Sequence, residues 1–330
     1  MATLYLTEQG VTMTKTDGRL VVRKDGKILQ DLPAIHIDQI VVFGNAHFTM
    51  PAVNFILQEG IDVAYLSSHG TYRGRLQHAV AKDATLRQAQ YHQAQDPAFC
   101  LAMAQGFIKG KVHNALVFVQ RQQAKHTDIR ASLNVLRQME RQIPTAASLD
   151  VLRGYEGTAA AAFFRAFRVL LKYDLGFRTR VHHPPTDPVN VLLSLGYTLL
   201  YNQTFAAINI VGLDPYLGFF HQTRHGHATL ASDLIEEWRT LLVDSVVLGM
   251  INRGEFSVTD FRATRQGQLQ LRSEGLNRFL KAYDARVQSS VLYAPSQQQL
   301  QYLRCIEMQV RQVAQVLSNQ QAAYQPYTTR

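Results

Sequence analysis

Residues 148–171 of the 330-residue chain read SLDVLRGYEGTAAAAFFRAFRVLL, and their apolar side chains recur at the spacing of one helix face. The apolar stripe consists of Leu152, Ala159, Phe163, Phe167 and Leu170. Ser148 precedes the stripe and can accept a hydrogen bond from the first N–H groups of a helix. The pattern predicts one long amphipathic helix at the centre of a mostly helical region.

Glu156 falls inside this apolar stripe, where its carboxylate would leave water. That transfer costs several kcal/mol unless the group is paired, hydrogen-bonded or bound to a metal. Gly154, Gly157 and the run Ala159–Ala162 leave room for another helix or a ligand to come close. Two interpretations follow for Glu156, a structural salt bridge to a buried arginine or a ligand of a metal ion.

Residues 218–242, GFFHQTRHGHATLASDLIEEWRTLL, combine a histidine-containing loop with a second amphipathic helix. We expect Thr229 to cap this helix. Its apolar arc comprises Leu230, Ala231, Leu234, Ile235, Trp238, Leu241 and Leu242. Asp233, Glu236 and Glu237 lie outside the arc, which is typical of a solvated acidic face.

His221 gives these carboxylates a second interpretation. One imidazole and two or three carboxylates can coordinate a hard divalent cation and leave positions open for phosphate oxygens. Mixed nitrogen and oxygen ligands favour Mg²⁺ or Mn²⁺, although His225 and His227 in the same loop keep zinc from being excluded. A site of this kind belongs with phosphoryl transfer, and helical periodicity alone does not choose between Glu236 and Glu237.

Residues 3–76 alternate apolar and polar side chains in short runs, which predicts β-strands. The runs are TLYLT, VTMTK, RLVVRK, KILQDL, QIVVF, DVAYL and TYRGRL. Asp17-Gly18 and Asp25-Gly26 are typical of tight hairpins, because glycine accepts the positive φ that such turns require. Residues 49–60, TMPAVNFILQEG, instead predict one short helix packed on a single sheet.

The period changes from strand to helix near residues 81–84, so we expect an α+β fold of two domains. The first, residues 1–82, would be a β-sheet domain with one short helix. The second, residues 83–321, would be an all-α catalytic domain. Residues 322–330, AAYQPYTTR, lack periodicity and are expected to be a disordered tail.

The amino-acid composition narrows the possible binding partners of the protein and its possible location in the cell. A net charge of +9 and a pI near 9.6 favour nucleic-acid binding, although an acidic membrane surface or an acidic protein suits the same charge. The two cysteines, Cys100 and Cys305, exclude a disulfide framework and a cysteine-based zinc site. No signal peptide and no run near the roughly 18 apolar residues of a membrane span occur, so we expect a cytoplasmic protein that binds no membrane.

Five further residues are candidates for DNA contact. Arg178, Arg180 and Arg224 lie near the segments described above and can make bidentate bonds to phosphate, although each can equally be an ordinary surface residue. Tyr197 and Tyr201 share one face of the helix predicted after residue 187. Their rings can stack along DNA or belong to the core.

The chain resembles one known protein family over essentially its whole length. The segments that carry the resemblance are LYLTEQGVTM (4–13), IDQIVVFGNAHFT (37–49), GIDVAYLSSHGTYRGRL (60–76), GYEGTAAAAFF (154–164), HHPPTDPVNVLLSLGYTLL (182–200), GLDPYLGFFH (212–221) and LASDLIEEWR (230–239). In this order and at these spacings they resemble the CRISPR-associated endonuclease and integrase of spacer acquisition, the Cas-one family.

The resemblance implies that Glu156, His221 and Glu236 are the catalytic metal ligands and that Asp233 is an auxiliary carboxylate. It also implies a metal-dependent DNA integrase and endonuclease of antiviral defence, which inserts captured foreign DNA fragments into a CRISPR array. A 3′-hydroxyl of the fragment would attack a phosphodiester, and water in its place would make the enzyme a nuclease. Two alternatives stay open, a structure-specific metal nuclease acting on branched DNA and a non-catalytic DNA-binding scaffold.

The implied partners are double-stranded DNA, a second copy of the chain bound through the β domain, and a small ferredoxin-like bridging protein that joins two dimers. The chain departs from the family pattern at three histidines. His182, His183 and His227 stand where many members carry arginine. Because histidine is mostly neutral at pH 7, phosphate contacts at these positions would be weaker and more dependent on pH. His182 and His183 can also simply cap the turn before two prolines.

Overall fold

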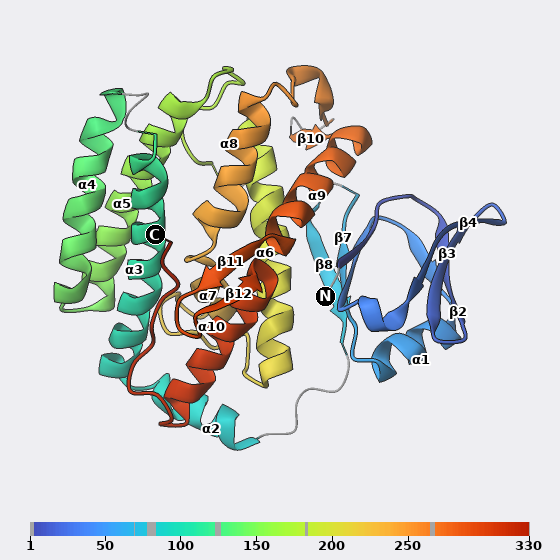
Figure 1. The fold of residues 1–330 in the computed structure, drawn as a ribbon, viewed down its shortest axis with the longest axis horizontal. Helices are drawn as coiled ribbons and strands as arrows, with labels where there is room; N and C mark the ends of the chain where they lie inside the picture. Colours follow the sequence, from blue (N-terminus) through green and yellow to red (C-terminus); the bar gives the residue numbers. More distant parts are fainter. Residues whose placement is uncertain are drawn as a thin grey trace.

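The computed structural model of the chain describes residues 3–68, 70–77, 84–122, 127–181, 184–264 and 268–329. In these residues a strand-rich N-terminal region packs beside a larger helical region (Figure 1). The expected α+β composition is confirmed, as is the expected order, in which a strand-rich region precedes a helical one. The expected domain boundary at residues 82 and 83 lies outside the described residues, as do His182 and His183.

The described part of the strand-rich region is built from short strands and one helix. Its elements are β1 (Thr3–Leu6), β2 (Val11–Thr16), β3 (Arg19–Lys24), β4 (Lys27–Pro33), β5 (Gln39–Phe43), β6 (Ala46–Phe48), α1 (Met50–Gln58), β7 (Asp62–Leu66) and β8 (Tyr72–Leu76), with a 3-10 turn at Ala34–His36. Each expected strand and the expected short helix are confirmed. β6 escapes the alternation pattern because it has only three residues.

The strands β4, β3, β2 and β6 form one sheet in that order. Asp17 between β2 and β3 has a φ of 52°, and Asp25 and Gly26 between β3 and β4 have φ angles of 49° and 77°. Positive φ at these positions is what a tight hairpin requires, so both predicted hairpins are confirmed.

The expectation of a single sheet is wrong, because β1, β5, β7 and β8 form a second one. β1, β5 and β7 run parallel, and β8 pairs antiparallel with β7. Along β5, Ile40 and Val42 join an N-terminal hydrophobic cluster, whereas Val41 and Phe43 join the core of the helical region. A strand covered on both faces reads as a nearly continuous apolar run, as QIVVF does. This second sheet therefore attaches the helical region to the N-terminal one.

The helical region contains α2 (Ala84–Gln93), α3 (Pro97–Gln120), α4 (Arg130–Gln142), α5 (Leu149–Leu170), α6 (Pro188–Val211), α7 (Thr229–Ile235), a π-helix (Arg239–Asp244), α8 (Ser245–Asn252), α9 (Ser273–Gln288) and α10 (Tyr302–Leu317). It also contains two antiparallel strand pairs, β9 (Phe261–Ala263) with β10 (Leu269–Leu271) and β11 (Ser290–Tyr293) with β12 (Gln298–Gln301). The all-α expectation is wrong there, because strands of three or four residues are too short to show alternation.

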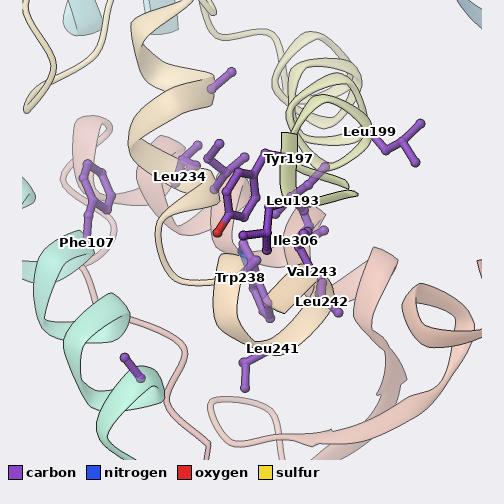
Figure 2. Close-up of a cluster of buried hydrophobic side chains, with 14 of the residues drawn as sticks. Phe107, Leu193, Tyr197, Leu199, Leu234, Trp238, Leu241, Leu242, Val243 and Ile306 are labelled. Carbon is purple, nitrogen blue, oxygen red and sulfur yellow. The ribbon is translucent and has the colours of Figure 1, made fainter. Parts of the chain in front are cut away.

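The helix α6 runs through the middle of the molecule (Figure 1). By length and composition it could cross a membrane, but 78% of its most apolar stretch is buried inside the protein, as in a core helix. Leu193 and Tyr197 of α6 lie in the same buried cluster as Trp238 and Val243 (Figure 2). The core therefore joins α6 to the segment that follows α7.

The chain after α10 folds back along α3 (Figure 1). Tyr324 and Tyr327 are buried, and the ring of Tyr327 stacks on Trp238 with 4.6 Å between centroids. The backbone N–H of Thr329 donates to Oδ1 of Asn114 on α3. The expected disordered tail is therefore wrong for residues 322–329, because two anchoring tyrosines in so short a segment give no periodic signal.

Candidate active site

The helix α5 begins as the sequence predicts, with the side chain of Ser148 accepting a hydrogen bond from the N–H of Val151. Glu156 lies two turns into the helix and is partly buried. A Cβ added at Gly154 or Gly157 would meet no atom of the described residues within 4 Å. The helix face beside Glu156 is therefore open to a ligand.

Asp233 organises the loop that carries His221. Its two carboxylate oxygens accept hydrogen bonds from the backbone N–H groups of Phe219, Phe220 and His221 at 2.7 to 3.0 Å. Oδ1 of Asp233 also lies 2.6 Å from Nδ1 of His221. A carboxylate can only accept, so Nδ1 donates, and Nε2 is the ring nitrogen left to face Glu236. Asp233 thus orients His221, and its own oxygens are already engaged.

The three carboxylates of the second motif do not form a solvated face. Asp233, Glu236 and Glu237 are 0%, 3% and 0% exposed. The reason is a break in the helix: α7 ends at Ile235, residues 236–238 form a turn, and the π-helix follows. The turn directs Glu236 toward His221 and Glu237 toward Tyr324.

Thr229 does not cap α7 and lies inside its first turn, after the N-cap Ala228. Its hydroxyl accepts a hydrogen bond from the N–H of Gly218 and donates to the carbonyl of Tyr216. Thr229 therefore fastens the loop before His221 to the start of α7.

Lys111 of α3 lies between the two glutamates. Its ammonium forms an ion pair with Oε1 of Glu156, and Nζ lies 2.7 Å from Oε2 of Glu236. Nε2 of His221 lies 3.9 Å from Oε1 of Glu236, and the guanidinium of Arg239 lies 3.1 Å from the same oxygen. Lys111 therefore joins Glu156 to Glu236, and His221 lies beside the other carboxylate oxygen of Glu236.

The sequence analysis missed Lys111, although a signal was present. Phe107, Lys111 and Ala115 follow one another at four-residue spacing, and both Phe107 and Ala115 are buried. A lysine inside an apolar helical stripe needs a carboxylate partner, for the same reason that Glu156 in α5 needs a cation.

The ionisable groups of the cluster hold one another in the charged state. Burial would raise the pKa of Glu236, but Arg239 and Lys111, with a smaller effect of His221, lower this pKa to about 2. Burial would likewise lower the pKa of Lys111, but attraction to Glu156 and Glu236 raises it above its ordinary value. Two carboxylates and two cations therefore neutralise each other in a water-poor site.

Glu156, Glu236 and His221 offer ligands that fit a divalent ion, and Lys111 now lies between the two glutamates. No group of three or more His, Cys, Asp or Glu side chains is arranged around a metal position in the part of the chain that the structure describes. Oε2 of Glu236 is buried, and among the described residues it accepts no hydrogen bond and pairs with Lys111 alone. Two carboxylates that share a cationic group, with an imidazole Nε2 beside one of them, are ligand types suited to Mg²⁺ or Mn²⁺.

A cavity of about 100 Å³ adjoins the cluster. It is lined by Lys111 and Glu156 of the cluster and also by Tyr197, Arg180 and Asp244. The Tyr197 hydroxyl donates to Asp244, and the guanidinium of Arg180 lies 5.2 Å from the centre of the Tyr197 ring. Burial raises the pKa of Asp244 to about 6. Tyr197 is therefore a core residue, and its ring is covered by arginine.

Tyr201 and Arg180 line a more open cleft of about 570 Å³, together with His227 and Arg239. The ring of Tyr201 stacks on His227, and its hydroxyl accepts a hydrogen bond from the N–H of Ala228. This cleft reaches Arg239, which contacts Glu236, so it leads to the glutamate cluster.

The two remaining candidate arginines lie on the surface. Arg224 is exposed in the loop after His221. Arg178 is exposed as well and pairs with Asp174. Neither lines the cleft that contains Tyr201.

Comparison with known proteins gives one consistent family. The family model of CRISPR associated protein Cas1 matches residues 4–285. The CRISPR-associated endonuclease Cas1 3 of Thermus thermophilus is 36% identical over 329 residues, which cover 99% of this chain and 97% of that protein.

Two solved structures share the fold. A chain of a Cas6-RT-Cas1–Cas2 complex superposes with a TM-score of 0.86 at 27% identity, covering 100% of this chain and 36% of that one. A casposase bound to its integration product gives a TM-score of 0.86 at 24% identity, over 98% of this chain and 93% of the casposase, which is a likeness of fold alone. From the family match and the close relative, the chain belongs to the CRISPR-associated Cas1 family.

Proposed function

We propose that the protein is a divalent-metal-dependent DNA endonuclease and integrase, which inserts captured DNA fragments into a CRISPR array. The observation that carries the proposal is the meeting of Glu156 and Glu236 at one cationic group, with His221 beside Glu236, next to a cleft lined by arginines. Membership of a family whose relatives are called endonucleases supports the same activity.

Glu156, Glu236 and Nε2 of His221 would hold the ion, while Asp233 keeps the imidazole in the required orientation. A bound Mg²⁺ or Mn²⁺ supplies Lewis acidity and charge neutralisation at a phosphate. In the reaction the 3′-hydroxyl of the fragment would lose its proton and form a new P–O bond. The 3′-oxygen of the array would leave with its electron pair and take up a proton, becoming a hydroxyl. One phosphodiester replaces another, so the step needs positioning and charge stabilisation but no further energy source.

Double-stranded DNA is the proposed substrate, in keeping with the net charge of +9. Arg180, Tyr201 and Arg239 line the cleft that leads to the cluster and would contact the strand near the scissile phosphate. Exposed Arg224 and Arg178 would contact phosphates outside the cleft. Tyr197 is covered by neighbouring side chains, and we assign it to support of the site and not to base stacking.

We further propose that two copies of the chain associate through the N-terminal region, residues 1–82, which would be a dimerisation domain beside the catalytic one. β4 is the edge of its sheet, and Ile28 and Leu29 on it are 53% and 46% exposed. An edge strand with exposed apolar side chains gains from being covered. A small ferredoxin-like protein would bridge two such dimers, in keeping with the Cas1–Cas2 complex among the similar structures. The assembly would act in the cytoplasm, where the DNA lies.

The test uses full-length protein, the bridging partner, a plasmid with CRISPR repeats, and Mn²⁺. Fragments ending in 3′-hydroxyl should be joined to the plasmid, and fragments ending in 3′-phosphate should not. Glu156→Gln should abolish joining while DNA affinity stays within about threefold of wild type, because the cleft arginines remain.

Each of the other possible results would support a different function for this protein. Equal products from both fragment ends would show that the fragment end is not the nucleophile. Cleavage of branched DNA without joining would identify a structure-specific nuclease. Full activity of Glu156→Gln would leave a DNA-binding scaffold whose chemistry lies in a partner.

A further inference from the structure

Lys111 contacts the same carboxylate oxygens that the proposed function assigns to a metal ion. Its ammonium pairs with Oε1 of Glu156 and lies 2.7 Å from Oε2 of Glu236. Its side chain is only 16% exposed, so these contacts are largely shielded from water. Arg239 and His221 lie instead beside Oε1, the other oxygen of Glu236, at 3.1 and 3.9 Å.

Some cation must stand between the two glutamates whenever no metal ion is bound. Two carboxylates that share a buried site repel each other, and one of them would otherwise take up a proton or move into water. Arg239 meets Glu236 from one side only, and Glu156 has no ion-pair partner besides Lys111 within the described ranges of the chain. Lys111 is therefore the group that balances Glu156.

The ammonium and a divalent ion cannot occupy this position together. Metal ligation needs the lone pairs that now face Nζ, and a dication would repel an ammonium a few ångströms away. The cavity beside the cluster offers the lysine another place, because Lys111 itself lines it and so does the carboxyl group of Asp244. Its apolar part, which includes Ala115 and Phe163, suits the methylene stem.

We propose that Lys111 is a tethered counter-cation, which fills the metal position in the ion-free protein and must move toward the adjoining cavity before a divalent ion binds. The inference rests on the proposed function, since it presumes that Glu156 and Glu236 are metal ligands. It assigns Lys111 two effects, a stable ion-free fold and a lowered metal affinity. The site would thus release its ion easily and stay folded without it.

The first test measures Mn²⁺ affinity directly by electron paramagnetic resonance, with no DNA present. Lys111→Met keeps the length of the stem and removes the charge, and Lys111→Gln is a second variant that accepts hydrogen bonds. The matched control is Lys109→Met, because Lys109 is exposed on the same helix and carries the same charge. Both Lys111 variants should bind Mn²⁺ about tenfold more tightly than wild type, and Lys109→Met should bind as wild type does.

The second test measures thermal unfolding in a chelator and in saturating Mn²⁺. Lys111→Met should have a lower midpoint than wild type in the chelator, and Mn²⁺ should raise it by more than it raises the wild type. If Lys111 had only a structural role, Mn²⁺ would raise the unfolding midpoint of Lys111→Met by no more than it raises that of the wild type.

The third test needs no variant. Mass spectrometry of the wild-type protein after brief acetylation gives the modification of Lys111 relative to Lys109. Mn²⁺ should change this ratio, because the ammonium leaves its carboxylate partners for the cavity beside Asp244. An unchanged ratio would overturn the displacement step.

The outcomes separate this inference from the proposed function. Unchanged or weaker Mn²⁺ binding by folded Lys111 variants, while the wild type binds the ion, would overturn the counter-cation role and leave the proposed metal site standing. Absence of Mn²⁺ binding by wild type and both variants alike would overturn the metal site and the inference with it.

Discussion

At the scale of single residues, neighbouring carboxylates of the segment 233–237 have different chemistry because they face different surroundings. Asp233 accepts from three backbone N–H groups and from the imidazole of His221. Glu236 faces Lys111 and Arg239, which lower its pKa to about 2. Burial instead raises the pKa of Glu237 to about 8, although Tyr324 and other uncharged donors bind its carboxyl group.

Asp233→Asn tests the orienting role of this carboxylate. The amide nitrogen cannot accept, so at least one backbone N–H or the His221 ring loses its partner. We expect a loss of stability of about 1–3 kcal/mol in urea unfolding and a fall in Mn²⁺ affinity of about 10- to 100-fold. Asp174→Asn is the control, since Asp174 also accepts from a backbone N–H but is exposed. Wild-type Mn²⁺ affinity in Asp233→Asn would contradict the assigned role.

Glu237→Gln tests the raised pKa of this residue. The unfolded chain ionises at its ordinary pKa of 4.5, whereas the folded protein keeps the proton up to about pH 8. The folded state therefore binds more protons between these values, and stability falls as pH rises through this window, by roughly 1.4 kcal/mol per pH unit. Glu237→Gln carries no such proton, so its unfolding free energy should fall less between pH 5 and pH 8.

Urea titrations at both pH values give the comparison for Glu237→Gln. Glu274→Gln on the exposed start of α9 should follow the wild type. Parallel pH dependence of wild type and Glu237→Gln would mean that Glu237 is ionised in the folded protein across this range.

At the scale of elements, the break after α7 is what separates Glu236 from Glu237. A continuous helix would place them about 100° apart on one surface. With the turn at 236–238 and the π-helix, Glu236 meets Lys111 whereas Glu237 meets Tyr324. The C-terminal segment holds this break in place. The backbone N–H of Tyr327 donates to Glu237, and the Tyr327 ring covers Trp238.

Tyr327→Ala tests how much the C-terminal segment contributes. Tyr327 is 3% exposed, and its removal leaves a cavity against Trp238 that we expect to cost about 3–5 kcal/mol. Tyr173→Ala is the control, because Tyr173 is 53% exposed. The free energy of unfolding is measured for both variants and for the wild type. A loss in Tyr327→Ala no larger than in Tyr173→Ala would show that the segment is not part of the core in solution.

At the scale of the whole molecule, the second sheet joins the hairpin sheet to the helical core. One of its faces belongs to the N-terminal cluster and the other to the helical cluster. Arg75 of β8 forms a buried ion pair with Asp62 of β7 and crosses this junction by donating to Asn202 of α6. The edge strand β4, whose Ile28 and Leu29 are exposed, lies far from α5 and α7 (Figure 1).

The double substitution Ile28→Asp and Leu29→Asp tests association through β4. The wild type should have the mass of a dimer in light scattering, and the variant should have the mass of a monomer, because charge on an interface strand opposes its burial. Val258→Asp adds a charge at a residue of the helical region that is 65% exposed, and it should remain dimeric. A dimer of unchanged strength in the double variant would place the interface elsewhere.

The sequence by itself determined the features that depend on local spacing. Period-2 runs defined the strands through β8 other than β6, Asp-Gly pairs located both hairpins, and the apolar stripe with Ser148 located α5. An acidic residue in an apolar stripe was enough to single out Glu156, because burial of an unpaired charge is costly wherever the helix packs.

Only the tertiary structure decided which distant groups meet. The pairing of Lys111 with Glu156 and Glu236, the burial of Glu237 under the C-terminal tyrosines, and the division of the strands into two sheets all join residues far apart in the chain. Periodicity reports on one element at a time, whereas these contacts depend on how elements pack. The environment of a charge, and with it the chemistry, is therefore set by packing.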